Sequence, residues 1–467
     1  MIITLVLITI LYVSANLLVG LWKLRGTTYS EFVACPGAIN KYALTLSLCG
    51  TVIGGGMFFT VAQMGFEAGL AVLALPGAYV IGYLVLSFAI PAIRKSMFSP
   101  NVNTLYDIVS VRLPQGGAWT SIYKGLLSTV TFGMYFFMLS AQFTIIANFY
   151  VFVLGLSSTN AWLLSLLVIG GTTLIYSVAG GIRKDIATDV FQMIIVSAGL
   201  VVLSIVMIRG QGLSLSDVPS SHYTFTGYGT LFPIGILLFF SPSFVGRYDY
   251  WQRIIAAKST QDARFALWLS LPIIVAAYVI FCFVGIYARS MSPNIDSAHA
   301  AVWFIRHALS PYVSLVVTLA FYAALMATSD TLLNVSSVSL AALASTVMSR
   351  YNRSIRSIRG IRTITIIVGL SASITVLLAA DTVDLIIGGF SSLVIITPGL
   401  LYVLLTRRPS AIVGSASLLL GYLSFLIAFI VTPDFRKYAF ILGFLIASAI
   451  IILGRSVLRI RSRQTFR

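Results

Sequence analysis

Long apolar runs, repeated along almost the whole chain, limit its fold more than any other feature. Each run has about 18 to 25 residues, the length that a helix needs to cross a hydrocarbon core ~30 Å thick. Hydrophobic residues make up 58% of the 467 and charged residues only 9%, so most of the surface cannot face water. Strand-like alternation is absent, and helices satisfy their own backbone in lipid. We therefore expect an all-α integral membrane protein.

The apolar runs predict about thirteen transmembrane helices. We place them at residues 2–21, 43–65, 69–93, 126–154, 160–179, 186–208, 229–248, 265–287, 311–345, 361–380, 383–406, 410–431 and 436–456. No long linker or low-complexity segment interrupts this series, so we expect a single membrane transporter domain over residues 1–467.

Every second loop is basic, which indicates the orientation of the chain. The basic groups are Lys23 and Arg25; Arg94, Lys95 and Arg112; Arg183 and Lys184; Arg253, Lys258 and Arg264; Arg350, Arg353, Arg356, Arg359 and Arg362; Arg407 and Arg408; and the tail from Arg455 to Arg467. This is the positive-inside pattern with the N-terminus outside and the C-terminus cytoplasmic. We expect a multi-pass protein of the cell (inner) membrane. The net charge of +17 is divided among short loops at membrane borders, which indicates contact with lipid and no nucleic-acid surface.

Two predicted spans contain helix-breaking residues. The second holds Gly54, Gly55 and Gly56, and the seventh holds "FFSPSFVG", in which Pro242 lacks an amide hydrogen. With the first span set apart, these two begin consecutive groups of five helices, a pattern that points to an inverted-repeat transporter. The divisions are an accessory segment 1–41, repeats 42–208 and 229–406, accessory helices 410–456 and a basic tail 457–467. The alternative is that Gly and Pro are simply frequent in membrane helices, where Gly permits close packing.

A broken helix inside the membrane frees carbonyl oxygens that a monovalent cation can bind. Hydroxyl groups of a neighbouring helix would complete such a site. Ala324, Ala327, Thr328 and Thr331 have the spacing of one helical face, which can approach another backbone closely. The alternative is a packing stripe in which each Thr bonds to the carbonyl four residues earlier.

Two acidic residues in or beside predicted spans are also candidates, since charge is costly there. Asp189 follows the basic border at Arg183 by about a turn and a half, and it either attracts a cation or balances Arg183 and the positive end of its helix. Asp330 shares a helical side with Asn334 and Ser337, and its plain interpretation is a hydrogen-bonded structural carboxyl.

Signatures of enzymes and of resident cofactors are missing from the sequence. It has no Walker motif, no G-x-S-x-G and no H-E-x-x-H, and its three cysteines and three histidines do not form metal-binding spacings. We therefore expect a carrier rather than an enzyme, with no cofactor.

At three places the sequence resembles the sodium:solute symporter family. "SVAGGIRKDIATDVFQ", "DYWQRIIAAKS" and "AALMATSDTLLNVSS" occur in the family's order and spacing. The resemblance, over about residues 1–456, implies the leucine-transporter-type fold, an inverted repeat of five plus five helices with an additional N-terminal helix. It also implies sodium-coupled uptake by alternating access, with Na⁺ as the coupling ion.

The resemblance also implies a set of binding residues. The family's sodium site corresponds to Gly50, Ile53, Ala324, Ala327 and Thr328, and Asp189 corresponds to an acidic residue near the inner sodium path. Ala327 departs from the pattern, because a hydroxyl residue is expected there. The positions that contact sugar in glucose-type members are Val52 and Met57, so an amino acid or carboxylate is a better match than a sugar.

The substrate is expected beside the two breaks, near the middle of the bilayer. The candidate contacts are Gly54, Gly55, Gly56, Met57, Phe136, Phe137, Phe240, Ser243 and Thr331. The sequence thus predicts a secondary active transporter of a small organic solute driven by sodium. A proton-coupled carrier of the same fold and a solute-sensing membrane module are the alternatives. The oligomeric state stays open.

Overall fold

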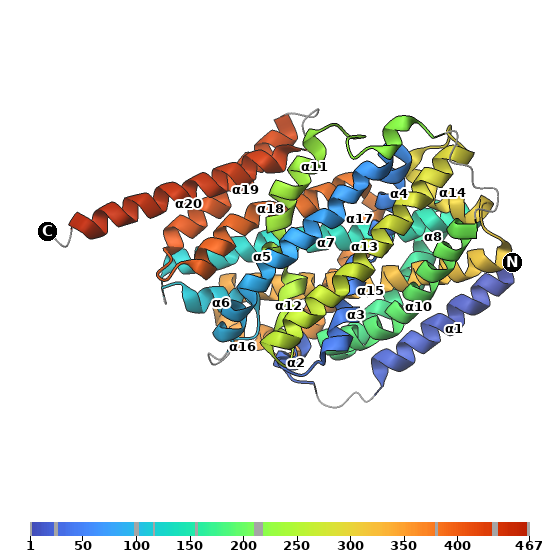
Figure 1. Ribbon diagram of the computed structural model, residues 1–467. Coiled ribbons are helices and arrows are strands. Elements are labelled where there is room, and N and C mark those ends of the chain that lie inside the picture. The colour runs from blue at the N-terminus through green and yellow to red at the C-terminus, as the bar shows by residue number, and fades with distance from the viewer. Residues whose placement is uncertain are drawn as a thin grey trace.

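The helices form one elongated bundle in the computed structural model (Figure 1). The structure describes residues 2–22, 27–97, 102–114, 117–154, 157–209, 218–378, 382–431 and 438–464. In these ranges the chain is nearly all helix, and one isolated bridge, Ile39 with Ala257, is the only pairing of extended segments. Lys23 and Arg25, which belong to the predicted basic pattern, lie outside the described residues.

Ten helices are long and continuous: α1 (Ile2–Leu21), α5 (Ala74–Ser96), α7 (Ala118–Leu154), α10 (Ile182–Arg209), α13 (Thr260–Met291), α15 (Pro311–Val347), α17 (Ile358–Leu378), α18 (Thr382–Leu405), α19 (Ala411–Val431) and α20 (Ala439–Gln464). Figure 1 shows α20 projecting beyond the bundle toward the C-terminus. The short helices are α2 (Tyr29–Val33), η1 (Gly69–Leu73), α6 (Leu105–Arg112), η3 (Ser220–Tyr223), η6 (Ser297–His299), α14 (Ala300–His307), η7 (Ser349–Tyr351) and α16 (Asn352–Ile355).

Three further helices are composite. They are α3 (Lys41–Val52) with α4 (Gly55–Ala68); α8 (Ser158–Ser165) with η2 (Leu166–Gly171) and α9 (Thr172–Gly180); and α11 (Leu231–Gly235) with η4 (Ile236–Phe240), η5 (Ser241–Gly246) and α12 (Tyr248–Ala256). The first and third of these contain the two predicted breaks.

The described helices agree with a multi-pass membrane protein. Nine stretches are long and apolar enough to cross a membrane, or ten when the bent pair Leu231–Gly246 and Tyr248–Ala256 counts as one span. Val6–Leu21 and Ser392–Leu405 are apolar but shorter. A helix lies at every predicted span, yet broken and short helices do not each meet the length, so the count of thirteen stays a prediction.

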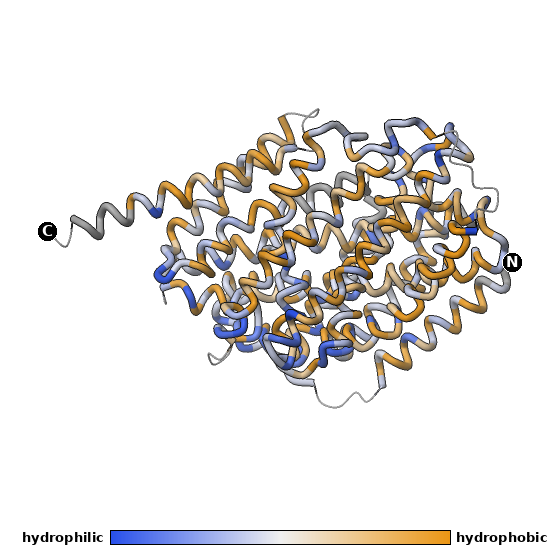
Figure 2. The backbone as a smooth tube through the Cα atoms, in the orientation of Figure 1, coloured by the Kyte–Doolittle hydropathy of each residue, from blue (hydrophilic) through white to orange (hydrophobic). Residues whose placement is uncertain are grey.

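Apolar side chains cover much of the outside of the bundle. Leu11, Phe88 and Ile208 are 70%, 73% and 85% exposed, and hydrophobic residues run along the helices in Figure 2. In water this surface would be unfavourable, whereas lipid tails solvate it without cost. The large apolar residues on the outside of the bundle are therefore consistent with a surface that faces lipid.

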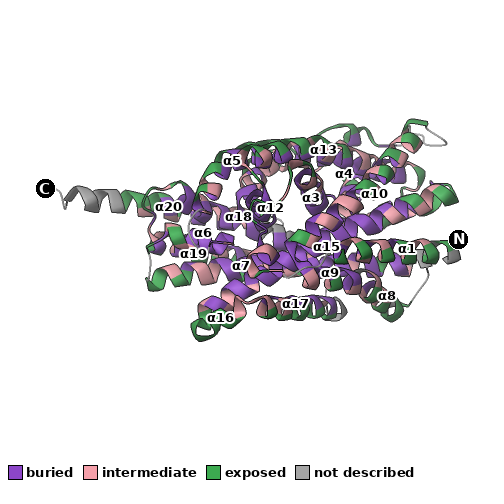
Figure 3. Cartoon of the chain, turned by 90° about the horizontal axis from the view of Figure 1, so that it is seen from below, coloured by how far each residue is buried: buried purple, intermediate pink, exposed green. Residues whose placement is uncertain are grey.

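Polar groups instead lie inside, on α15. Every residue from 320 to 339 is buried, including Asp330 and Asn334, and the helix packs against α7 and α10. Figure 3 shows α15 as a largely buried helix within the bundle. In water-soluble proteins polar groups lie mostly on the surface. Here the polar residues of α15 lie inside, and helices with apolar outer faces surround them.

One end of the bundle, called here the basic end, carries Lys41, Arg94, Arg183, Lys258 and Arg356. Arg94 donates to the Lys258 carbonyl, Lys41 begins α3, and Arg183 and Arg356 both contact α2. At this end the segment before α3 pairs with the end of α12: the Ile39 amide donates to the Ala256 carbonyl at 3.0 Å. Arg94 donates from Nη1 to the carbonyls of Ile254 and Ala257, at 2.8 and 2.7 Å. The two broken helices are therefore tied together at the basic end.

Candidate functional site

The first break lies at Ile53 and Gly54, between α3 and α4. Ile53 has φ −81° and ψ 73°, and the Gly54 amide donates to the Val52 carbonyl at 2.9 Å, which is an inverse γ-turn. Because the Gly54 amide is used in this turn, the carbonyl of Gly50 loses its usual helical donor. The predicted break is confirmed, and it leaves a carbonyl oxygen inside the bundle.

Thr328 of α15 faces this carbonyl. Its hydroxyl oxygen lies 3.2 Å from the Gly50 carbonyl oxygen and 3.0 Å from that of Ala324, four residues earlier. The hydrogen bond to Ala324, which the packing alternative predicts, is therefore present. The contact with Gly50, which the binding-site hypothesis predicts, is present as well. A Cβ at Gly54 would lie 1.9 Å from Thr328 Oγ1, so only glycine permits this approach.

Ala327 lies next to Thr328 and turns its methyl group toward Gly50. A Cβ built on Gly50 would meet Ala327 Cβ at 3.3 Å and Asp189 Oδ1 at 3.1 Å. Asp189 is fully buried, and its Oδ1 has no hydrogen-bond partner within the described part of the chain. A methyl group and a carboxylate oxygen thus lie where a hydroxyl was expected.

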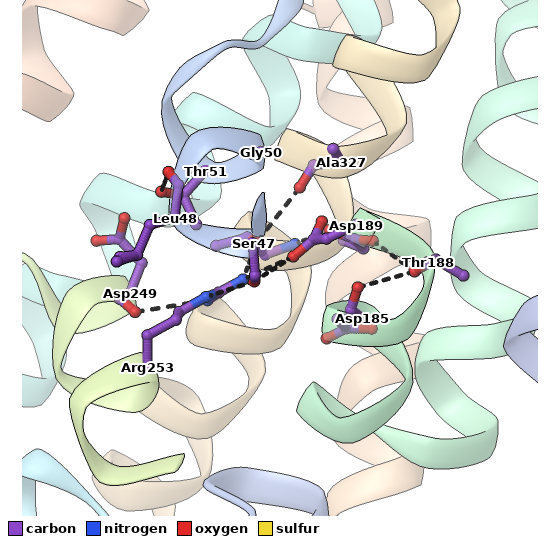
Figure 4. Close-up of polar contacts among 12 residues, drawn as sticks. Ser47, Leu48, Gly50, Thr51, Asp185, Thr188, Asp189, Asp249, Arg253 and Ala327 are labelled. Atoms are coloured by element: carbon purple, nitrogen blue, oxygen red, sulfur yellow. Dashed lines mark hydrogen bonds and ion pairs between the residues drawn. The ribbon is translucent and has the colours of Figure 1, made fainter. Parts of the chain in front are cut away.

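The second oxygen of Asp189 belongs to a network centred on Arg253 (Figure 4). Asp189 Oδ2 accepts from Ser47 Oγ at 2.5 Å and pairs with Arg253 Nη2 at 3.3 Å. Arg253 also donates from Nε to Ser47 Oγ at 3.1 Å and from Nη2 to Thr331 Oγ1 at 2.7 Å. One guanidinium on α12 therefore connects α3, α10 and α15.

Two predictions are corrected by this network. Arg253 was expected in a basic loop, but it is 2% exposed, because the chain resumes as α12 after the second break and stays inside the bundle. Asp189 was allowed as a partner of Arg183 at the membrane border. It pairs with Arg253 instead, and Arg183 pairs with Glu31 at 3.4 Å. Asp189 is an interior residue.

Two more buried carboxylates lie close to Asp189. Asp330 Oδ2 accepts from the Tyr176 hydroxyl at 3.0 Å, so the expected hydrogen-bonded carboxyl is confirmed, with a partner other than Asn334. Asp185 Oδ1 accepts from Ser177 Oγ at 2.8 Å, while its Oδ2 has no partner among the described residues.

The three aspartates, 185, 189 and 330, are called here the carboxylate cluster. Within the described ranges Arg253 forms its ion pair with Asp189, whereas Asp185 and Asp330 accept hydrogen bonds from neutral hydroxyls. Three carboxylates are thus buried here beside one paired guanidinium. Such a group favours a bound proton or a bound cation, since like charges buried together are costly.

The second break follows η5. Arg247 has an extended backbone, and the helix axis turns by 51° between Leu231–Gly246 and Tyr248–Ala256. Arg247 forms a two-pronged ion pair with Asp249, from Nε to Oδ1 at 3.2 Å and from Nη2 to Oδ2 at 2.5 Å. The Tyr135 hydroxyl of α7 donates to the same carboxylate. The second predicted break is present, but it lies at Arg247, five residues after Pro242, and it holds a buried pair of charges.

The predicted substrate contacts on α4 lie at the first break. A Cβ at Gly55 would lie 2.2 Å from Leu325 Cδ2, and one at Gly56 would lie 3.1 Å from Gln142 Nε2. Met57 is half-buried and packs against the core. Gly54, Gly55 and Gly56 are thus brought to α15 and α7.

The other predicted contacts are more scattered. Phe137 is 44% exposed on the outside of the bundle, whereas Phe136 is half-buried. The Phe240 ring lies 5.7 Å from that of Phe244, and Ser243 Oγ donates to the Phe240 carbonyl at 2.5 Å. Thr331 accepts from Arg253. The structure does not bring Phe137 to the breaks.

Sequence reasoning missed Arg247, Asp249 and Gln142. The two charges lie at and just past the end of the predicted span 229–248, five and seven residues after Pro242, and the rule that singled out Asp330 applies to them also. Gln142 is 5% exposed in the middle of α7. It gave no signal, because one amide in an apolar run has no spacing to recognise.

Comparisons with known proteins agree with this geometry. The model of the sodium:solute symporter family matches residues 32–406, which include both breaks and the carboxylate cluster. Two solved transporters share the fold. A Na⁺-coupled sialic acid symporter in a substrate-bound outward-open state is 16% identical, with 97% of this chain and 98% of that chain covered and a TM-score of 0.73. A closed nucleobase-cation-symport-1 family transporter is 15% identical, with 93% and 96% covered and a TM-score of 0.58.

A mutant manganese transporter of Eremococcus coleocola is 13% identical, with 95% and 100% covered and a TM-score of 0.53. At these identities the solved structures show a shared fold only. The family model is the stronger finding, since it matches most of the chain, and it agrees with the multi-pass helical architecture. This chain belongs to the sodium:solute symporter family.

Proposed function

We propose that this chain is a secondary transporter that carries a small organic solute across the cell membrane together with sodium. The observation that carries the proposal is the 3.2 Å approach of the Thr328 hydroxyl to the freed carbonyl of Gly50. Broken helices in transporters offer such carbonyls to Na⁺ near the middle of the bilayer. Family membership supports the same function, and the sialic acid symporter with the same fold is Na⁺-coupled.

The sodium site proposed here is built by α3 and α15. Its ligands are the carbonyls of Gly50, Ile53 and Ala324 and the hydroxyl of Thr328. Ala327 belongs to the site by position but contributes no side-chain oxygen. Asp189 Oδ1, which is buried and without a partner among the described residues, places negative charge beside Gly50 and offsets that loss.

The broken helices also support an inverted repeat. We infer that residues 42–208 and 229–406 are the two five-helix units, because α3 with α4 begins one and the broken helix before α12 begins the other. The segments 1–41 and 410–456 are accessory helices, and 457–467 is a cytoplasmic tail. The basic loops favour an outside N-terminus in the inner membrane.

In the transport cycle proposed here, sodium stabilises an outward-open form and substrate closes the outer side. Release of sodium past Asp189 toward the basic end then frees the substrate inside. Arg253 lies on this route, bound to Asp189 and Thr331. Coupling is reciprocal, so substrate raises the affinity for sodium by the factor by which sodium raises the affinity for substrate.

Thermal unfolding of the purified protein tests the sodium site. In NaCl the melting temperature should exceed that in KCl of equal ionic strength, because an ion that binds only the folded state stabilises it. Thr328→Val keeps the shape without the hydroxyl and should remove most of this shift. Thr365→Val is the control, since Thr365 is also buried and, in the described part of the chain, its hydroxyl donates to the Ile361 carbonyl four residues earlier. Equal shifts in all three proteins would contradict the site, and no shift in the wild type would contradict sodium binding.

Proton coupling is the second candidate function. It is favoured by the carboxylate cluster, in which Asp185 Oδ2 and Asp189 Oδ1 have no partners within the described residues and Arg253 pairs with Asp189. Proteoliposomes that are more acidic outside than inside, without sodium, test this candidate. Uptake of the substrate driven by this proton gradient would support it, and Asp185→Asn should then abolish that uptake. Uptake that requires sodium and ignores the pH gradient would exclude it.

A further inference from the structure

The ion pair Arg247–Asp249 is the clearest buried charge outside the sodium site and the carboxylate cluster. Arg247 is 7% exposed and Asp249 is 1% exposed. Both partners lie in the first residues after the second break, where the backbone of Arg247 is extended. Charges are costly in this environment unless they are paired or used, so their place at a break points to a function.

The pair lies level with the first break. Arg253 donates to Ser47, so these two residues lie at the same depth. Asp249 precedes Arg253 by about one turn of α12 and lies farther from the basic end. From Ser47 about one turn of α3 leads in the same direction to Gly50. Each turn advances by ~5.4 Å, so Asp249 and Gly50 are at similar depth in the bundle.

One face of α7 connects the two breaks. Tyr135 donates to Asp249, and Gln142, seven residues later, lies on the same face about 10 Å along the helix. The Gln142 amide faces Gly56 at the first break, and its Oε1 is buried without a partner among the described residues. A buried amide oxygen that lacks a donor points to a ligand at this place.

Aromatic rings surround the pair. The Arg247 guanidinium carbon lies 4.4 Å from the centroid of the Tyr250 ring and 5.9 Å from that of Phe244. Phe244 in turn packs against Tyr79, with the ring centroids 4.6 Å apart. These rings exclude water and strengthen electrostatic interactions inside.

We propose that Arg247 and Asp249 form the polar end of the substrate site and select a zwitterion. The carboxylate of the substrate binds the Arg247 guanidinium, and its ammonium group binds Asp249, while Gln142 donates or accepts at the other end of the site. Two opposite charges held side by side complement a molecule that carries both. An anion alone would face Asp249, a cation alone would face Arg247, and a neutral sugar would pair with neither.

This inference rests on the proposed transport function, whose substrate it names by class. The test is thermal unfolding of the full chain in NaCl with single compounds added. The zwitterions are the common L-amino acids and glycine betaine; the anions are acetate and pyruvate; the cation is ethanolamine; the neutral solutes are glucose and mannitol. At least one zwitterion should raise the melting temperature, and at the same concentration the other classes should not.

Variants then locate the effect. Arg247→Gln and Asp249→Asn should each weaken the apparent affinity for the zwitterion about tenfold or more, because each removes a charge-assisted hydrogen bond. Arg247→Lys keeps the charge and should retain part of the binding. Arg356→Gln is the control: it removes another guanidinium–carboxylate pair, with Asp107 at 2.7 Å, in which Arg356 is 28% exposed and which lies at the basic end.

The sodium shift, which is the difference in melting temperature between NaCl and KCl, is measured in the same samples and shows whether each variant is folded. It also distinguishes failure of the sodium site from failure of the zwitterion site. A variant that keeps the sodium shift and loses the zwitterion supports the inference. If Arg247→Gln does not fold, Arg247→Lys and the double variant Arg247→Gln with Asp249→Asn decide instead, since the double variant removes both charges together. The inference is overturned if no zwitterion stabilises the wild type, if a single anion or sugar does so equally, or if the charge variants bind the zwitterion as the wild type does. Loss of the sodium shift alone would overturn only the sodium half of the proposed function.

Discussion

The hydroxyl of Thr328 lies 3.2 Å from the carbonyl oxygen of Gly50, across the break that interrupts the first core helix. The contact depends on two neighbouring residues, Ile53 and Gly54, and on a helix far away in the sequence, α15. The inverse γ-turn at Ile53 removes the backbone donor of Gly50, and the absence of a side chain at Gly54 lets α15 come close. A break and a small-residue face thus become one site.

The first prediction concerns Gly54. Gly54→Ala places a methyl group 1.9 Å from Thr328 Oγ1, so α15 must move away from the break. We expect a loss of about 1 to 3 kcal/mol in the free energy of unfolding, the usual cost of overpacking, and loss of the sodium-dependent shift. Gly133→Ala in α7 is the control, because a Cβ there meets nothing within 4 Å. Thermal unfolding in NaCl and KCl measures both; a Gly54→Ala protein that melts as the control does would contradict the packing.

The second prediction concerns Ala327. Ala327→Ser returns a hydroxyl to a residue whose methyl faces Gly50, and this adds an oxygen to the proposed sodium site. We expect the sodium concentration for half-maximal stabilisation to fall by several-fold, since each good ligand adds affinity. Ala341→Ser, on the same helix but distant from the break and also buried, should leave it unchanged. A serine at 327 that does not alter the sodium titration would show that the ion binds elsewhere.

The sequence was sufficient for the all-helical, multi-pass architecture but not for the polar interior. Apolar length predicts the long membrane helices because the bilayer sets that length. Gly54 lies at the first break and Pro242 lies five residues before the second, so backbone chemistry alone indicates both. The approach of Thr328 to Gly50 followed from helical spacing and the family resemblance. Helix length, the breaks and the spacing of one helix face are local properties, so a single sequence is enough to predict them.

Arg253 shows why the rest was not predictable. A basic residue after an apolar run has the pattern of a cytoplasmic loop, and nothing local reveals that the helix resumes after a 51° bend. Its burial depends on partners on three other helices, Ser47, Asp189 and Thr331. Pairing over such separations is set by tertiary packing, so Asp189 was predicted as an ion-path residue without its partner.

The third prediction concerns the buried pair of Arg253 and Asp189. Arg253→Gln leaves the Asp189 carboxylate without its cation in a site where the two side chains are 1% and 0% exposed. We expect destabilisation of about 3 to 5 kcal/mol, and we expect the double variant with Asp189→Asn to recover much of it. Arg183→Gln is the control, since its pair with Glu31 is 59% and 36% exposed and should contribute about 0 to 1 kcal/mol. Chemical denaturation of the four proteins checks this; similar losses for both arginines would contradict a structural role of the buried pair.

The last prediction concerns the carboxylate cluster. Asp185, Asp189 and Asp330 are all buried, and Arg253 forms its ion pair with Asp189, so by like-charge repulsion one carboxyl should hold a proton when no other cation is bound. Sodium bound beside Asp189 adds positive charge and should drive that proton out, because cations and protons compete for the same oxygens. Adding NaCl to weakly buffered protein should therefore release protons into solution, and adding KCl should not.

Asp185→Asn should abolish the release while keeping the sodium-dependent melting shift. Asp107→Asn, which removes a carboxylate paired with Arg356 at the basic end, should release protons as the wild type does. A pH electrode or an indicator dye measures the effect. If the wild type binds sodium without releasing protons, the cluster is already balanced by its hydrogen bonds from Ser47, Tyr176 and Ser177, and it plays no part in coupling.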